Sequence, residues 1–134
     1  MDWMKVEAPS LEDIEALARV CFAELPSAFR ELAGDITFMV QDFPDDSVVE
    51  DMELESPFEI LGLFHGPDLA ARDQGHGAET TMIFLYRRPI LDYWTENTDS
   101  LGAIIRHVLI HEIGHHFGLS DEAMEGIEER DLPR

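Results

Sequence analysis

Two histidines four residues apart flank a glutamate in the segment His111-Glu112-Ile113-Gly114-His115. Residues four apart lie one above the other on an α-helix, so both imidazoles can reach a single metal ion. Nitrogen ligands suit Zn²⁺, with Zn–N distances of about 2.0–2.1 Å. Glu112 lies about 100° around the helix from His111. We therefore expect it beside the metal, where it can act as a base on a zinc-bound water.

The residues that follow supply a candidate third ligand. Gly118 can adopt the left-handed conformation that ends a helix and reverses the chain, which brings Asp121 back toward the metal. We expect His111, His115 and Asp121 to hold one Zn²⁺ per chain and to leave one position open for water. Glu125, which lies about 6 Å further along the next helix, is the alternative third ligand.

The other polar residues around this segment have simpler interpretations. His107 could form a hydrogen bond one turn before the pair, and His116 points away from it. We expect loop positions for His65 and His76. A solvated helix face explains the glutamates after the signature, which are Glu122, Glu125, Glu128 and Glu129.

The sequence places no obvious side chain to stabilise an oxyanion. Tyr86, Tyr93 and His76 are candidates by composition only. Arg87 and Arg88 could bind a substrate carboxylate, but we expect them to pair with acidic groups on the surface.

Together the residues read HExxHxxGxxD, which resembles the long zinc signature of the metzincins with aspartate in place of the last histidine, as in snapalysin-like secreted proteases. With residues 61–66 and 82–90, this segment resembles the small bacterial zincin-like proteins, which are described as minimal zincins and predicted metallopeptidases. The resemblance covers residues 58–124. It implies a compact α+β fold and peptidase activity, and it names no substrate.

Two features depart from the metzincin pattern. Only 13 residues follow Asp121, too few for the C-terminal subdomain of a metzincin. We expect Met124, the only later methionine, on a short acidic helix capped by Ser120 and not in a tight Met-turn. Other residues are then expected to form the floor of the zinc site.

The expected reaction is peptide-bond hydrolysis, in which Glu112 takes a proton from the zinc-bound water and passes it to the leaving amine. The expected partner is a peptide or protein substrate that adds a strand to the sheet edge at residues 61–64, where Gly62 would let another backbone approach closely. One alternative is a zinc-stabilised peptide- or protein-binding module with weak or no catalytic activity, which would not need Glu112. Another is a protein in which the histidines are core residues.

Composition limits the class of protein. The 134 residues include nine Lys and Arg against 29 Asp and Glu, which gives a formal net charge of −20. Such a surface repels phosphate backbones and anionic membranes, so we expect no nucleic acid and no membrane as partners. Solubility is the simplest explanation of the charge, and selection for basic partners is the other.

Two further observations concern the cellular context. The single cysteine, Cys21, excludes an internal disulfide and a cysteine-rich zinc site. We find neither a signal-peptide pattern nor a run of about 18 apolar residues that could span a membrane, and we expect a cytoplasmic protein. The oligomeric state is not indicated.

Apolar periodicity predicts the elements that must position these residues. Helices are expected over 11–25, from Pro26 to the residue before Gly34, over 87–94 and over 101–117, and strands over 36–40, 59–64 and 80–86. Ser10 is the expected cap of the first helix, and Thr98 or Asp99 of the zinc-binding one. An exposed acidic loop is expected at 42–57 and a connection at 66–79.

Apolar residues surround most of the helix at 101–117, so it should be buried among other elements. We expect residues 1–134 to form a single domain with an α+β, minimal zincin fold, in which a small mixed sheet packs on helices around the buried HExxH helix.

Overall fold

The structure, a computed structural model, describes residues 1–66 and 81–130, which contain helices and three strands. In chain order the elements are α1 (Leu11–Ala23), α2 (Ser27–Ala33), β1 (Ile36–Gln41), α3 (Asp46–Asp51), β2 (Gly62–His65), β3 (Thr81–Tyr86), α5 (Arg87–Glu96), α6 (Leu101–His116) and α7 (Asp121–Arg130). The expected connection at 66–79 lies, apart from Gly66, outside the described residues, as does His76. No described helix is long and apolar enough to cross a membrane.

β3 is the central strand of a small mixed sheet with the order β1-β3-β2. It pairs in parallel with β1 and antiparallel with β2, so that Ile83 is opposite Phe38 on one side and Phe64 on the other. All three side chains are buried, and this face of the sheet therefore contributes to the core. The predicted α+β class with a small mixed sheet is confirmed.

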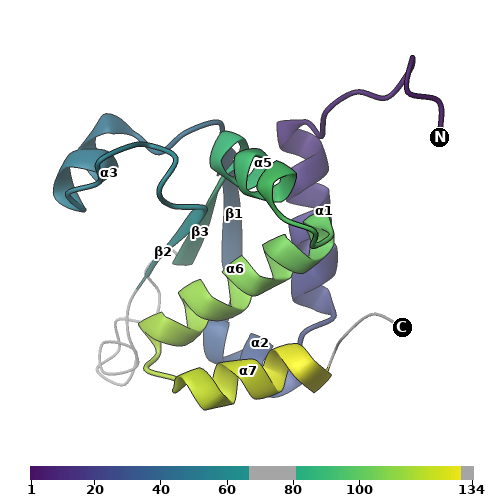
Figure 1. Ribbon diagram of the computed structural model, residues 1–134. Coiled ribbons are helices and arrows are strands. Elements are labelled where there is room, and N and C mark those ends of the chain that lie inside the picture. Colours follow the sequence, from purple (N-terminus) through teal and green to yellow (C-terminus); the bar gives the residue numbers. More distant parts are fainter. Residues whose placement is uncertain (67–80, 131–134) are drawn as a thin grey trace.

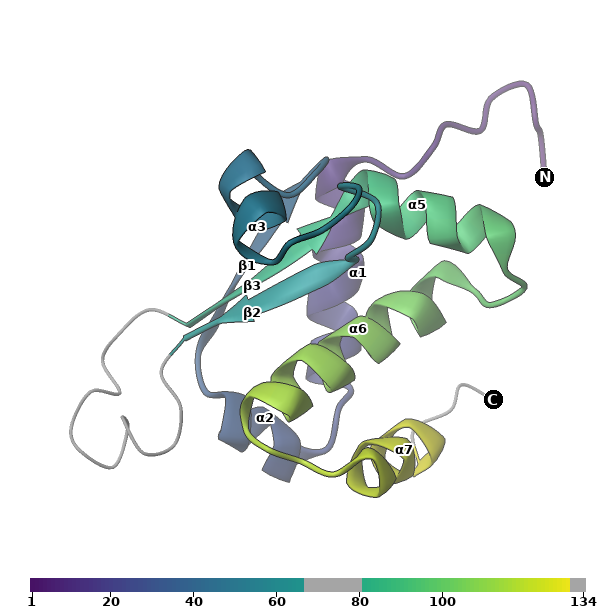
Figure 2. The same ribbon diagram turned by 60° about the vertical axis from the view of Figure 1, so that its left-hand side comes forward.

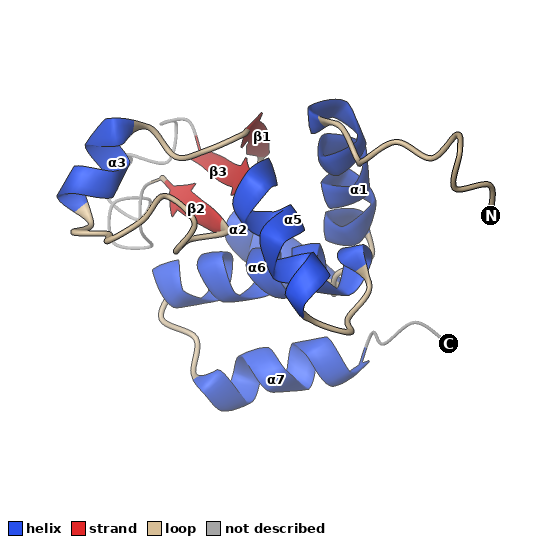
Figure 3. Cartoon of the chain, turned by 45° about the horizontal axis from the view of Figure 1, so that its top comes forward, coloured by secondary structure: helices blue, strands red, loops and turns tan. Residues whose placement is uncertain are grey.

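α6 packs against more of the described elements than any other helix does. It lies between β2 and α7 (Figures 2 and 3) and also packs against α1 and α5 (Figure 1). Its buried aliphatic residues are Ile104, Ile105, Val108, Leu109, Ile110 and Ile113. Because neighbours cover it on several sides, apolar residues are needed around most of its circumference. The predicted burial of this helix is confirmed.

The helix caps follow local side-chain chemistry. The predicted capping box of α1 is present, because the Ser10 hydroxyl accepts the Asp13 N–H and the Asp13 carboxylate accepts the Ser10 N–H. The predicted cap of α6 is wrong. Ser100 caps this helix by accepting the Ala103 N–H at 3.1 Å. Thr98 and Asp99 lie too early in the chain, since the helix begins at Leu101.

Two predicted segments differ in extent. The expected acidic loop at 42–57 contains the helix α3, and the rings of Phe43 and Phe58 lie 5.2 Å apart across it. The expected strand at 59–64 begins only at Gly62. The preceding residues form a turn, in which the Glu59 carboxylate accepts the Glu55 N–H at 2.9 Å.

Candidate metal centre

A row of three imidazoles lies along one face of α6. His107, His111 and His115 follow at four-residue intervals, with ring centroids 4.0 Å apart in the first pair and 5.7 Å apart in the second. The middle side chain is the most covered, since His111 is 24% exposed and the other two are 56% and 58% exposed. The predicted pair is therefore part of a longer row that also includes His107.

The chain reverses after α6 as predicted. Gly118 has a φ of 76°, in the left-handed region that favours glycine. Ser120 caps α7 by accepting the Ala123 N–H at 3.1 Å. Asp121, the first residue of α7, is 87% exposed, and its Oδ1 lies 3.9 Å from His115 Nε2. The predicted third ligand thus lies beside one of the two predicted histidines, and its role as a ligand stays a prediction.

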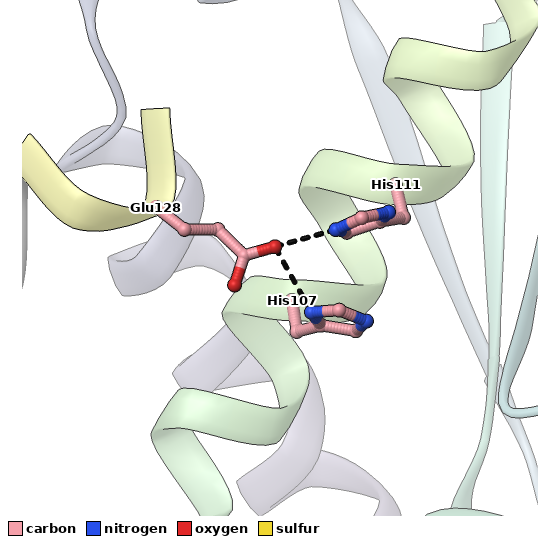
Figure 4. Close-up of side chains that lie close together, drawn as sticks. All are labelled: His107, His111 and Glu128. Atoms are coloured by element: carbon pink, nitrogen blue, oxygen red, sulfur yellow. Dashed lines mark hydrogen bonds and ion pairs between the residues drawn. The ribbon is translucent and has the colours of Figure 1, made fainter. Parts of the chain in front are cut away.

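His111 contacts a different carboxylate. Its Nε2 is 2.5 Å from Glu128 Oε1, and His107 Nδ1 is 2.9 Å from the same oxygen (Figure 4). Within residues 1–66 and 81–130, this is the only group whose three potential ligand atoms all lie within 4.8 Å of one another. The expectation that Glu128 belongs to a solvated helix face is therefore wrong, because its side chain is only 27% exposed.

The surroundings of Glu128 lower the pKa of its carboxyl. Burial alone raises this pKa, but hydrogen bonds and electrostatic interactions with His107 and His111 lower it overall. Glu128 lies seven residues after Asp121, so both side chains are on the same face of α7, two turns apart. That spacing is the sequence signal that could have identified Glu128. Glu125, the alternative ligand, is exposed.

Two residues, Arg106 and Met124, make further contacts between α7 and α6. The guanidinium of Arg106 donates to the carbonyl oxygens of Ile127 and Glu128 at 2.8 and 2.9 Å. Met124 is fully buried, and a β-carbon on Gly114 would lie 2.5 Å from its sulfur. Met124 is on a capped helix, as predicted, and it packs directly against Gly114 of the histidine-bearing segment. The expectation that other residues form the floor of the zinc site stays a prediction.

Glu112 lies on the side of α6 that borders the sheet. It lines a groove of about 240 Å³ together with His111, Leu61 and Gly62. Burial raises the pKa of the Glu112 carboxyl, and the nearby charge of His115 offsets part of this effect. Among the described strands, β2 pairs only with β3 and is an edge of the sheet, as predicted for this segment. The predicted base and one predicted ligand therefore share a groove beside an edge strand.

Gly62 has a different role from the one expected. A β-carbon at this position would lie 2.8 Å from the carbonyl oxygen of Phe84 and 2.8 Å from Cγ1 of Val108. Glycine is therefore needed because α6 and β3 approach the start of β2 closely. It is not explained by the approach of a substrate backbone.

The candidates for oxyanion stabilisation occupy different environments. Tyr86 is only 1% exposed, and burial, followed by the negative charges of Asp45 and Glu112, raises its pKa to about 12. Tyr93 is partly exposed and lines a neighbouring cavity of about 380 Å³. The predicted surface pairing of Arg87 is confirmed by a 3.1 Å contact with Asp42.

The chemistry of these side chains suits zinc. Imidazole nitrogens and carboxylate oxygens are among the donors that Zn²⁺ binds in proteins. Two helices, α6 and α7, present them from two directions to a partly exposed face. Three such donors leave a coordination position for water, which is the arrangement of a catalytic zinc site.

The family model for zincin-like metallopeptidases matches residues 33–130, a range that contains the three strands and the whole of α6 and α7. No curated protein matched the sequence.

Proposed function

The chain belongs to the zincin-like metallopeptidase family, and on this basis we propose that it is a zinc-dependent peptidase in which His111, His115 and Asp121 hold the metal and Glu112 is the general base. The observation that supports this most directly is the position of Glu112 in the groove beside β2, together with His111. A purely structural zinc site would not require a half-buried carboxyl at that place.

In the proposed reaction, the bound metal and Glu112 have separate roles. When bound, Zn²⁺ would lower the pKa of a coordinated water toward about 7 and polarise the scissile carbonyl. Glu112 takes the proton from the attacking water and then delivers it to the leaving amine. Burial raises the pKa of Glu112. This brings the pKa nearer to the working pH than that of an exposed glutamate, which suits a group that must both accept and return a proton.

The substrate in this proposal is a peptide segment in extended conformation. It adds a strand to the outer edge of β2, at residues 61–64, through main-chain hydrogen bonds. This placement is supported by the groove, whose lining includes Leu61, Gly62 and Glu112. A peptide in that position has its backbone next to the base and the metal ligands.

The proposal is tested by substituting Glu112 with glutamine. Glu112→Gln should keep the zinc content of the wild type and lower peptide cleavage by about 10²–10⁴-fold, because general-base catalysis contributes about that factor. Glu129→Gln, at an exposed position of α7, is the matched control and should change neither property. Zinc content and cleavage of an unbiased peptide library are measured on all three proteins. Wild-type turnover in Glu112→Gln would show that the assigned base is wrong.

The second candidate function is a zinc-stabilised module that binds peptides or proteins. It is favoured by the contacts of Glu128 with His107 and His111, which complete a set of three potential ligands without Glu112. This candidate would replace the first if the wild type binds zinc and peptides but cleaves no member of the library.

A further inference from the structure

Three donor atoms from two helices converge beside α6, outside the predicted ligand set. Glu128 Oε1 lies 2.9 Å from His107 Nδ1 and 2.5 Å from His111 Nε2 (Figure 4). Two imidazoles and one glutamate are a known ligand set for zinc, with a fourth position left to water. All three atoms lie within 4.8 Å of one another. Small side-chain movements would therefore place each of them at the Zn–N or Zn–O bonding distance of about 2.0–2.2 Å from one shared ion.

The backbone that carries Glu128 is held in place independently of the histidines. Arg106 donates two hydrogen bonds to the carbonyl oxygens of Ile127 and Glu128. One turn earlier, Met124 packs against Gly114 of α6. A ligand on a helix that is fixed at two points costs little ordering when a metal binds.

We propose that His107, His111 and Glu128 form a second position for Zn²⁺, and that this position and the one at His111, His115 and Asp121 cannot be filled at the same time. The exclusion rests on the proposed function, which defines the other position. Both positions need His111, and a neutral imidazole has only one nitrogen with a free lone pair. The chain then holds one zinc ion in either of two places along α6.

The two positions have consequences for the peptidase. Zinc at the second position leaves His115 and Asp121 without metal. It also ties up His107 and His111, which line the same groove as Glu112, while Glu128 and His107 line the neighbouring cavity of about 380 Å³. The second position is therefore an alternative, off-site location that competes with the first for the shared histidine.

The experiment uses the full chain with His115→Ala, which removes one ligand of the first position and none of the second. Because His115 is 58% exposed, this substitution should leave the fold intact. Zn²⁺ alone is the probe, and its affinity is measured by competition with a chromophoric chelator. Glu128→Gln and His107→Ala are each added to this background, with Glu129→Gln and His65→Ala as matched exposed controls.

His115→Ala should still bind one equivalent of zinc. Adding Glu128→Gln or His107→Ala should weaken binding by at least about 100-fold, because even the loss of a residue that only supports a ligand costs about 10–100-fold. The two controls should leave the affinity within a factor of about two of the background. If Glu128→Gln and Glu129→Gln have equal effects, the second position does not exist.

Asp121→Asn provides a second background in case His115→Ala does not fold, since Asp121 is 87% exposed. The same loss on adding Glu128→Gln is expected there, and its absence overturns the proposal. The test distinguishes this proposal from the proposed function. Equal zinc affinities of the wild type and His115→Ala would argue against the first position while leaving the second. Zinc binding by the wild type but not by His115→Ala or Asp121→Asn would argue against the second position while leaving the first.

Discussion

Met124 packs against Gly114 so closely that a β-carbon at position 114 would lie 2.5 Å from the methionine sulfur and 3.0 Å from its Cγ. Gly114 is the fourth residue of the HExxH segment on α6, and Met124 is fully buried on α7. The same helix α7 carries Asp121 at its start and Glu128 two turns later. The spacing between these two helices therefore determines which carboxylate reaches which histidine.

Gly114→Ala should destabilise the protein by about 1–3 kcal/mol, as expected for overpacking in a closely packed interior. Met124→Ala should cost about 2–5 kcal/mol, because it leaves a cavity. In the double variant the new methyl group occupies part of that cavity, so the two costs should not add. The free energies of unfolding of the four proteins in denaturant test this. Simple additivity would show that the two residues do not interact.

One equivalent of zinc per chain is expected after dialysis without a chelator, whichever of the two positions is filled. It should be lost as the solution is acidified, because ligating histidines must be neutral and ligating carboxylates ionised. Elemental analysis across a pH series measures the zinc content at neutral pH and its loss in acid. A zinc content well under half an equivalent at neutral pH would contradict the proposed site.

Asp121→Ala and Glu125→Ala should differ in zinc affinity. In a Glu128→Gln background, which removes the second position, Asp121→Ala should weaken binding by at least about 100-fold, because only two ligands then remain. Glu125→Ala should bind nearly as the background does, because Glu125 is exposed and lies one turn beyond Asp121 along α7. Zinc affinity is measured by chelator competition on both variants. A larger loss of affinity in Glu125→Ala than in Asp121→Ala would assign the third ligand to Glu125.

Tyr86 should ionise only at high pH. Burial raises its pKa to about 12, above the value of about 10 for an unfolded chain. A folded-state pKa that is raised in this way contributes stability that is fully present below pH about 10 and is lost as the pH rises through about 12. In a pH titration, the tyrosinate absorbance of the folded protein should therefore contain a late component that appears only near pH about 12. This component should be absent from Tyr86→Phe and present in Tyr93→Phe. Persistence of the late component in Tyr86→Phe would contradict this assignment.

Local spacing in the sequence was sufficient for much of the architecture. The capping box at Ser10, the reversal at Gly118 and the cap at Ser120 depend on residues within four positions of one another, so nearby residues decide them. The burial of α6 was predictable for a related reason. An apolar circumference is stable only when other elements surround it.

Predictions failed where hydrogen bonds depended on the detail of one position. Ser100, and not Thr98 or Asp99, caps α6, because only the residue directly before the first turn can reach the Ala103 N–H. The role of Gly62 was also misjudged. A side chain at position 62 would collide with Val108 on α6 and Phe84 on β3, and both residues are distant in sequence.

By itself the sequence determined that α6 presents His111 and His115 one turn apart, with Glu112 beside them, because helical geometry relates residues within a single turn. Only the tertiary structure decided which carboxylates contact these histidines. Asp121 approaches His115 because a short turn joins them, whereas Glu128 reaches His107 and His111 because α7 packs back along α6. That packing depends on Met124 against Gly114 and on Arg106 at the carbonyl oxygens of Ile127 and Glu128. These contacts join residues 10 to 22 positions apart, beyond the range over which helical periodicity can predict a neighbour.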